Sequence, residues 1–189
     1  MVALPAQRRY SIQEYLRLEA FSNVRHEWLG GQIFAMAGGT PEHGVYSANV
    51  IALLATAVRG KRCRVQSSDV RIRVPATGLD TYPDASVVCG HVEVDAEDKD
   101  AVTNPVLIVE VLSPSTRDYD RGEKLENYQQ LASLTEVLFV DPTARALEVV
   151  RRTGGGWTRT SSDVKVRLAS IDAELLATEV FHDPLAAGP

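Results

Sequence analysis

The chain has 189 residues and a formal net charge of -5, with 44% hydrophobic and 24% charged residues. These values are typical of one compact globular domain, and they exclude a disordered or a membrane-spanning chain. The acidic balance argues against a broadly basic nucleic-acid-binding surface, because proteins that hold phosphates usually carry excess positive charge.

No segment has the pattern of a membrane span or a secretory signal. The longest apolar stretches have strand length, far short of a bilayer-spanning helix. Arg8 and Arg9 are followed by no apolar region of the kind found in signal peptides. We therefore expect a cytoplasmic protein without membrane contact, with a flexible arm at 1–9, a single domain at 10–183 and a flexible tail at 184–189.

The sequence offers few soft metal ligands. Cys63 and Cys89 are the two cysteines and lie in no CxxC motif, so we interpret them as two buried or half-buried thiols. The four histidines form no HxxxH pair, which argues against a histidine-rich metal site. Any metal ion would be held mainly by oxygen atoms.

The first third of the chain predicts a helix, a hairpin and a second helix. A capping box beginning at Ser11 predicts a helix over about 12–20. Two strand-like runs, at 24–29 and 32–37, flank a pair of glycines that suits a hairpin turn. A threonine cap, a proline and helical apolar spacing predict the second helix over 41–59.

The remainder of the chain is dominated by strands. An acidic stretch at 91–104 predicts an exposed loop, and a helix is expected over about 116–131. Strands are expected over 64–74, 82–89, 105–112, 136–141, 146–152 and 164–168. This order predicts a mixed α/β fold, with a central mixed sheet flanked by helices and an N-terminal β-hairpin.

Glu110 is the most informative residue, because it interrupts the apolar run Val106–Leu112. A buried, unpaired carboxylate loses several kcal/mol of hydration. A cation or hydrogen-bond donors must therefore compensate Glu110. An arginine ion pair, or a strand end that reaches solvent, would also explain it.

Asp84 follows Pro83 at the start of the preceding expected strand. Pro83 lacks a backbone N–H and restricts Tyr82 to an extended conformation, so Asp84 would sit near a strand end. If the two strands are neighbours, Asp84 and Glu110 can share one face of the sheet. A hard cation such as Mg²⁺ would relieve their repulsion and offset the acidic net charge. A turn-forming or strand-capping role for Asp84 is the alternative.

These residues belong to a pattern that resembles a known family. The pattern consists of Tyr82-Pro83-Asp84, then Glu110-Val111-Leu112-Ser113-Pro114-Ser115-Thr116, then Asp120 and Lys124. It resembles the Uma-type family of restriction-endonuclease-like proteins, placed in the PD-(D/E)XK nuclease superfamily, over nearly the whole chain. The resemblance implies a restriction-endonuclease-like fold with a catalytic site at Asp84, Glu110 and Lys124. That site would hydrolyse phosphodiester bonds of nucleic acid, with DNA favoured over RNA.

The lysine of this site is displaced. The superfamily's usual E-X-K motif places lysine two residues after the glutamate, where this sequence has Leu112. In the Uma-type pattern a lysine from the following helix takes its place, and Lys124 matches that position. Asp120 and Lys124 would share one helical face, with Tyr128 one turn further. An ordinary exposed ion pair is the alternative.

Glu27 and His43 join the site through the same resemblance. Glu27 resembles the extra acidic residue that many superfamily members contribute to the metal site, and we expect it to be catalytic; His43 matches the family pattern in the second helix. Each could instead be a solvated surface residue or a polar group at a helix end. The expected ligands of Mg²⁺, or of Mn²⁺, are Asp84, Glu110, the Val111 carbonyl and Glu27. The expected supporting residues are His43, Asp120 and Tyr128.

Three further expectations concern partners and alternatives. Arg71 and Arg73 would contact nucleic-acid phosphates, although solvated strand residues would show the same alternation. Apolar edge strands favour a homodimer, whose two sites would suit duplex cleavage. A nuclease-fold protein without turnover, acting as a binding or assembly module, fits the acidic charge and the displaced lysine. Acyl transfer by Ser113 or Ser115 lacks the glycine pattern of a nucleophile elbow, and these serines are expected to cap the helix.

Overall fold

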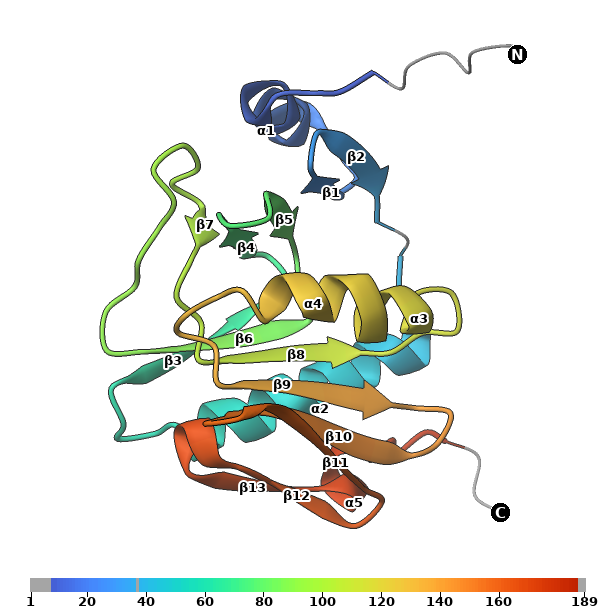
Figure 1. Cartoon of the computed structure of the whole chain (residues 1–189). Helices are drawn as coiled ribbons and strands as arrows, with labels where there is room; N and C mark the ends of the chain where they lie inside the picture. Colours follow the sequence, from blue (N-terminus) through green and yellow to red (C-terminus); the bar gives the residue numbers. More distant parts are fainter. Residues whose placement is uncertain (1–7, 37, 187–189) are drawn as a thin grey trace, which may run out of the picture.

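A six-stranded mixed sheet forms the centre of the molecule (Figure 1). The computed structural model describes residues 8–36 and 38–186. The strands, in spatial order, are β11 (Gly156–Ser162), β10 (Ala146–Thr153), β9 (Glu136–Asp141), β8 (Leu107–Val111), β6 (Ala85–Cys89) and β3 (Cys63–Ser67). β8 and β9 are parallel and fully buried, which explains their nearly continuous apolar sequences.

Each face of this sheet is covered by its own hydrophobic cluster. One face packs against α2 (Pro41–Ala57), β12 (Lys165–Leu168), η2 (Ala169–Ile171), β13 (Ala173–Leu176) and α5 (Ala177–Val180). The opposite face packs against α4 (Leu125–Tyr128), the last part of a helical segment that begins with α3 (Arg117–Tyr119) and η1 (Asp120–Lys124). Because side chains alternate along β8, Val109 faces α2 whereas Ile108 faces α4. Glu110 therefore belongs to the α4 face.

A smaller five-stranded sheet lies above α4 in Figure 1. Its strands, in spatial order, are β2 (Gln32–Ala35), β1 (His26–Leu29), β5 (Leu79–Thr81), β4 (Arg71–Val74) and β7 (Ala101–Val102). The hairpin of β1 and β2 turns at Gly30 and Gly31, whose φ angles of 56° and 93° favour glycine. α1 (Ile12–Phe21) packs against this hairpin, and the Tyr15 hydroxyl donates to the His26 carbonyl at 2.8 Å. The pairing of β1 with β5 joins the hairpin to the rest of the small sheet.

Several expected elements are confirmed. The capping box of α1 is formed in full by Ser11 and Glu14, and Thr40 caps α2 with Pro41 in its first turn. The N-terminal hairpin and the strands β9 and β10 also occur where expected. The predicted mixed α/β class is correct.

Other expectations need correction. The strand predicted over 64–74 is two strands, β3 and β4, which a turn from Ser67 to Val70 sends into different sheets. The helix predicted over 116–131 is broken by a π-helical turn, in which Gly122 has non-helical backbone angles. The expected loop at 91–104 contains β7. The strands β5, β11 and β13 and the helix α5 were not predicted.

The segment before α3 also differs from expectation. Ser113 and Ser115 were expected to cap the helix, but the residue at its N-terminal boundary is Thr116, which makes no capping side-chain hydrogen bond. The Ser113 hydroxyl instead lies 3.0 Å from that of Ser115 and 2.9 Å from that of Thr116. The hydroxyl groups therefore satisfy one another.

The two cysteines were expected to be thiols, but Cys63 and Cys89 form a disulfide. They are direct partners in the antiparallel pairing of β3 with β6, which aligns residues far apart in the sequence. Disulfides are typical of oxidising compartments, so this bond gives no support to the expected cytoplasmic location.

The two ends of the chain are described only in part. Residues 1–7 of the arm expected at 1–9 and residues 187–189 of the tail expected at 184–189 lie outside the described residues, so these boundaries stay predictions. Within the described ranges, no helix combines the length and apolar character required to cross a bilayer.

Candidate active site

Asp84 and Glu110 meet where β6 begins and β8 ends. Asp84 immediately precedes β6, and Ala85 pairs with Val109 of β8. The two strands are antiparallel neighbours, as a shared face requires, but the Asp84 side chain contacts α2 whereas the Glu110 side chain contacts α4. The Asp84 carboxylate accepts a hydrogen bond from the Val111 backbone N–H, with an Oδ2 to N distance of 2.7 Å. This bond ties Asp84 to the end of β8.

Lys124 reaches the same region from the helical segment that follows β8. Its Nζ lies 3.0 Å from Oε1 of Glu27, 3.0 Å from Oε1 of Glu110 and 3.6 Å from Oδ1 of Asp120. The lysine side chain is only 4% exposed. It belongs to the π-helical turn, a local irregularity that often occurs at functional sites. A buried ammonium group thus joins carboxylates from three separate segments.

Glu110 is compensated by two donors rather than by an arginine or by solvent. The Tyr128 hydroxyl donates to Oε1 of Glu110 at 2.6 Å, and the Lys124 ammonium lies beside the same oxygen. Burial raises the pKa of Glu110 to about 8, although the charge of Lys124 opposes this rise. Burial alone would lower the pKa of Lys124, but Glu110 and the other negative groups around it raise that pKa well above its usual value. The lysine therefore keeps its proton.

Glu27 lies in β1 and is held mainly by donors from β5 and from the helical segment. The Thr81 hydroxyl donates to Oε1 of Glu27, and the Tyr119 hydroxyl donates to Oε2 at 3.0 Å. Burial opposes ionisation of Glu27, but Lys124, Thr81 and Tyr119 outweigh it and lower the pKa of this carboxyl. Glu27 is thus an ionised partner of Lys124.

His43 and Ser47 bring α2 to the other side of Asp84. His43 Nε2 lies 3.3 Å from Oδ1 of Asp84, and the Ser47 hydroxyl donates to the same oxygen at 3.2 Å. The hydrogen bond with Asp84 raises the pKa of His43 against the opposing effect of burial, and the Val111 carbonyl adds to the rise. Asp84 and Val111 therefore stabilise the protonated form of the His43 ring.

Sequence reasoning missed three residues of this region. Ser47 lies one helical turn after His43, so the four-residue spacing could have indicated it. Thr81 and Tyr119 lie in segments whose approach to Glu27 depends on the pairing of β1 with β5 and on the helix after β8. No local signal in the sequence marks them.

The chain is similar in sequence to a known family and to two further proteins. A family model described as Uma2, putative restriction endonuclease, matches residues 12–180. The chain belongs to the Uma2 family. It is 36% identical to an uncharacterized protein of Synechocystis over 148 residues, covering 78% of this chain and 77% of that protein. A second uncharacterized Synechocystis protein is 27% identical over 154 residues, covering 82% and 87%.

A solved structure shares the fold of this Uma2 chain. It is the crystal structure of a putative nuclease belonging to DUF820 from Anabaena variabilis. The two superpose with a TM-score of 0.73 at 16% sequence identity, covering 89% of this chain and 96% of the other. The mixed α/β fold expected from the sequence is therefore found in a solved protein.

The chemistry of the Uma2 site suits a hard cation, although its acids are divided. The acids are Glu27, Asp84, Glu110 and Asp120. Lys124 contacts three of them, Glu27, Glu110 and Asp120, whereas Asp84 contacts His43. Within the described residues, no three His, Cys, Asp or Glu side chains form a metal-binding group. The ligand set expected to include Glu27 is thus not assembled here. Even so, the four carboxylates outnumber the single lysine, and Asp84 and the Val111 carbonyl raise the pKa of His43, which means that these oxygens favour positive charge beside them.

The arginines expected to contact nucleic acid instead contact acidic and aromatic side chains of this chain, with Arg73 buried and Arg71 half-buried. Arg71 forms two hydrogen bonds with Asp98, at 2.6 Å and 2.7 Å. Arg73 lies over the ring of Trp28 at 4.8 Å and 3.6 Å from Oδ2 of Asp80. The side chains of Arg71 and Arg73 are 12% and 8% exposed. They stabilise the small sheet, and a phosphate contact by them does not fit this arrangement.

Proposed function

We propose that this Uma2 member is a metal-dependent endonuclease that hydrolyses phosphodiester bonds, with DNA as the favoured substrate and Mg²⁺ or Mn²⁺ as the cofactor. The observation that carries the proposal is the buried Lys124–Glu110 pair beside Asp84 at the junction of β6 and β8. Burying such groups costs free energy that packing alone does not repay, and strongly perturbed groups of this kind cluster at functional sites. Membership of a family described as putative restriction endonucleases supports the same conclusion.

Asp84, Glu110 and the Val111 carbonyl would hold the metal ion. When bound, such an ion polarises a phosphate and lowers the pKa of a coordinated water. Lys124 supplies a fixed positive charge that can stabilise the negative charge developing on the phosphate. Glu27 and Asp120 keep Lys124 protonated and in place, so in this proposal Glu27 serves catalysis through the lysine. His43 lies beside Asp84, and the hydrogen bond between them raises the pKa of His43.

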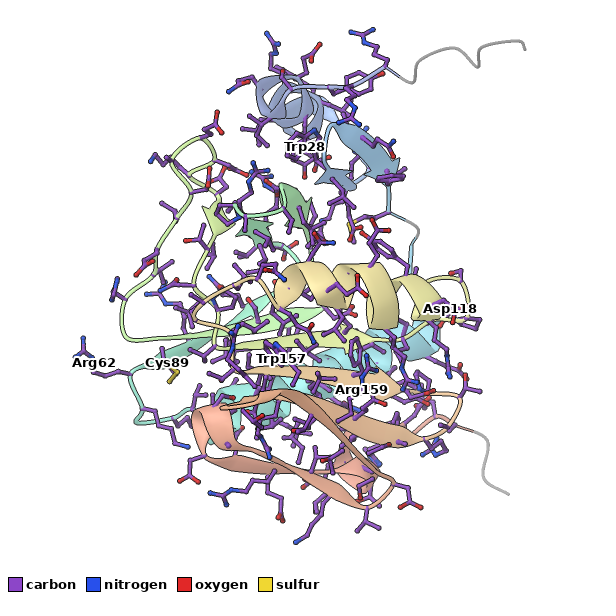
Figure 2. The ribbon with its side chains drawn as sticks, in the orientation of Figure 1. Trp28, Arg62, Cys89, Asp118, Trp157 and Arg159 are labelled. Atoms are coloured by element: carbon purple, nitrogen blue, oxygen red, sulfur yellow. A yellow bond between two sulfur atoms is a disulfide. The ribbon has the colours of Figure 1, made fainter. Side chains whose placement is uncertain are left out.

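A cleavage assay tests the proposal. Plasmid, single-stranded DNA and RNA are incubated with the purified protein in Mg²⁺, Mn²⁺ or EDTA. We expect DNA cleavage that EDTA abolishes and that Asp84→Asn, Glu110→Gln and Lys124→Met each reduce by at least about 100-fold. Asp118→Asn is the matched control, because Asp118 is exposed on the same helical segment and lies at the right-hand edge of the molecule in Figure 2. Metal-dependent cleavage that survives all three site substitutions would contradict the assignment.

A binding or assembly module without turnover is the second candidate. It is favoured by the engagement of Lys124 with three carboxylates, which leaves the lysine little freedom to act on a substrate. The same preparations distinguish the two. DNA binding without cleavage in any metal, together with no heat of Mg²⁺ binding by calorimetry, would favour this candidate over the nuclease.

A homodimer is a further part of the proposal. The strand β11 forms an edge of the six-stranded sheet, and an edge strand can pair with another chain. Two copies would place two sites on one duplex. Sedimentation equilibrium measures the mass directly, and a monomer at all concentrations would contradict the dimer.

A further inference from the structure

A cluster of positive charge lies at the end of the sheet opposite the candidate active site. Arg59, Lys61, Arg62 and Arg64 are all exposed, and they fall within six residues of a chain whose net charge is -5. We call these four residues the basic edge. They run from the end of α2 onto β3, the edge strand of the six-stranded sheet. Figure 2 shows Arg62 projecting into solvent near Cys89, far from Asp118 at the other end.

The guanidinium groups of the basic edge lack counter-ions. Across residues 8–36 and 38–186, the side chains of Arg59, Arg62 and Arg64 form no ion pair or hydrogen bond. Lys61 Nζ donates to the carbonyls of Ile171 and Asp172, at 2.5 Å and 3.0 Å, rather than to a carboxylate. Four neighbouring positive charges repel one another at a cost that an anionic ligand would remove.

The backbone that carries the basic edge is firmly held. The Cys63–Cys89 disulfide and the pairing of β3 with β6 join it to the sheet, and the Gly90 N–H donates to the Arg62 carbonyl at 2.7 Å. A hollow of about 240 Å³ opens between Arg62, Arg64 and Gly90. Arginines presented from a fixed backbone lose less conformational entropy when they bind an anion.

The strand β3 connects the basic edge to the candidate active site. Its last residue, Ser67, pairs with Ala85, the neighbour of Asp84. Arg62 lies five residues before Ser67, and at about 3.3 Å per residue this places it roughly 17 Å from the end of β3 beside Asp84. Duplex DNA advances about 3.4 Å for each base pair, so this distance corresponds to about five base pairs.

We propose that the basic edge binds the phosphate backbone of the nucleic-acid substrate, about five base pairs from the bond that is cut. The inference rests on the proposed nuclease function, which it extends by adding a second contact along the substrate. Arginine binds phosphate through two parallel hydrogen bonds, and three of the four cations are arginines. A membrane surface is a poorer partner, because no large exposed apolar side chain accompanies these cations within 59–64.

The test measures binding without cleavage. Fluorescence anisotropy in EDTA gives the affinity for a 20-base-pair duplex over a series of salt concentrations. The wild type is compared with the triple variant Arg59→Gln/Arg62→Gln/Arg64→Gln. The control is Arg17→Gln/Lys165→Gln/Arg167→Gln, which removes the same charge from exposed positions elsewhere. Vesicles containing phosphatidylserine form a second arm.

We expect the basic-edge variant to bind the duplex at least about tenfold more weakly than the wild type. The slope of log affinity against log salt should fall by about 2.7, because each lost phosphate contact contributes about 0.9. The control variant should stay within about threefold of the wild type. Equal affinities and slopes for the three proteins would overturn the inference, as would binding of the wild type to vesicles but not to DNA. If neither the wild type nor the variants cut DNA in the cleavage assay but the difference in DNA affinity persists, the nuclease proposal fails and the DNA-binding role of the basic edge stands.

Discussion

Replacing Lys124 with methionine removes the ammonium group that contacts three buried carboxylates while it keeps a chain as long as the apolar part of the lysine side chain. Nζ lies 3.0 Å from both Glu27 and Glu110 and 3.6 Å from Asp120. Removing one partner of a buried ion pair costs about 3–5 kcal/mol, because the remaining charge stays buried without compensation. Since domains of this size are stabilised by only about 5–15 kcal/mol, the variant should lose a large part of its stability.

The loss should grow with pH, and the direction follows from the carboxyl groups. Burial already raises the pKa of Glu110 to about 8, and burial also raises that of Asp120. Without Lys124 these pKa values rise further, and the pKa of Glu27 rises instead of being lowered. A carboxyl group whose folded pKa lies above its unfolded value costs up to about 1.4 kcal/mol per pH unit as the pH rises between the two. The variant should therefore be nearest to the wild type at pH 5 and furthest from it at pH 8.

Urea denaturation at pH 5 and pH 8, followed by tryptophan fluorescence, measures both effects. Lys99→Met is the control, because Lys99 is exposed and its loss should change the free energy of unfolding by less than about 0.5 kcal/mol. A Lys124→Met protein that matches the wild type at pH 8, or that loses more stability at pH 5, would refute the assigned role of the lysine.

Three further predictions concern single features. Tyr128→Phe should lower the free energy of unfolding by about 1.5–3 kcal/mol, because it removes the 2.6 Å hydrogen bond to the buried Glu110, and urea curves that coincide with the wild type would contradict this. Burial raises the pKa of Asp80 to about 7, so stability should fall as the pH rises from about 4 to 7 and then level. In Asp80→Asn the free energy of unfolding should fall less steeply with pH, by up to about 1.4 kcal/mol per pH unit. An unchanged dependence on pH would contradict the raised pKa of Asp80. Reduction of the Cys63–Cys89 disulfide, which spans 26 residues, should cost about 3.5 kcal/mol, whereas Cys63→Ser/Cys89→Ser should unfold identically with and without reductant.

Local signals predicted the parts of the fold that depend on neighbouring residues. The capping box at Ser11 and the Thr40-Pro41 start of α2 satisfy backbone groups within one turn, so the sequence alone locates both helices. The turn between β1 and β2 was also predictable from local sequence, because glycine adopts positive φ angles readily. Chain pairing is different: one apolar alternation over 64–74 is equally compatible with one strand or with two strands in separate sheets.

The candidate site shows the same division. A carboxylate at position 110, inside a run that must be buried, required a compensating group, and the sequence established that need from the cost of desolvation alone. Only the tertiary structure decided what meets it: Tyr128 and Lys124 approach after a π-helical turn, and Glu27 arrives with the β1–β5 pairing. Alternation likewise assigned Arg71 to one strand face, but whether that face met solvent or Asp98 depended on a loop 27 residues away in the chain. Burial and pattern are encoded along the chain, whereas partners separated by tens of residues are chosen when the sheets assemble.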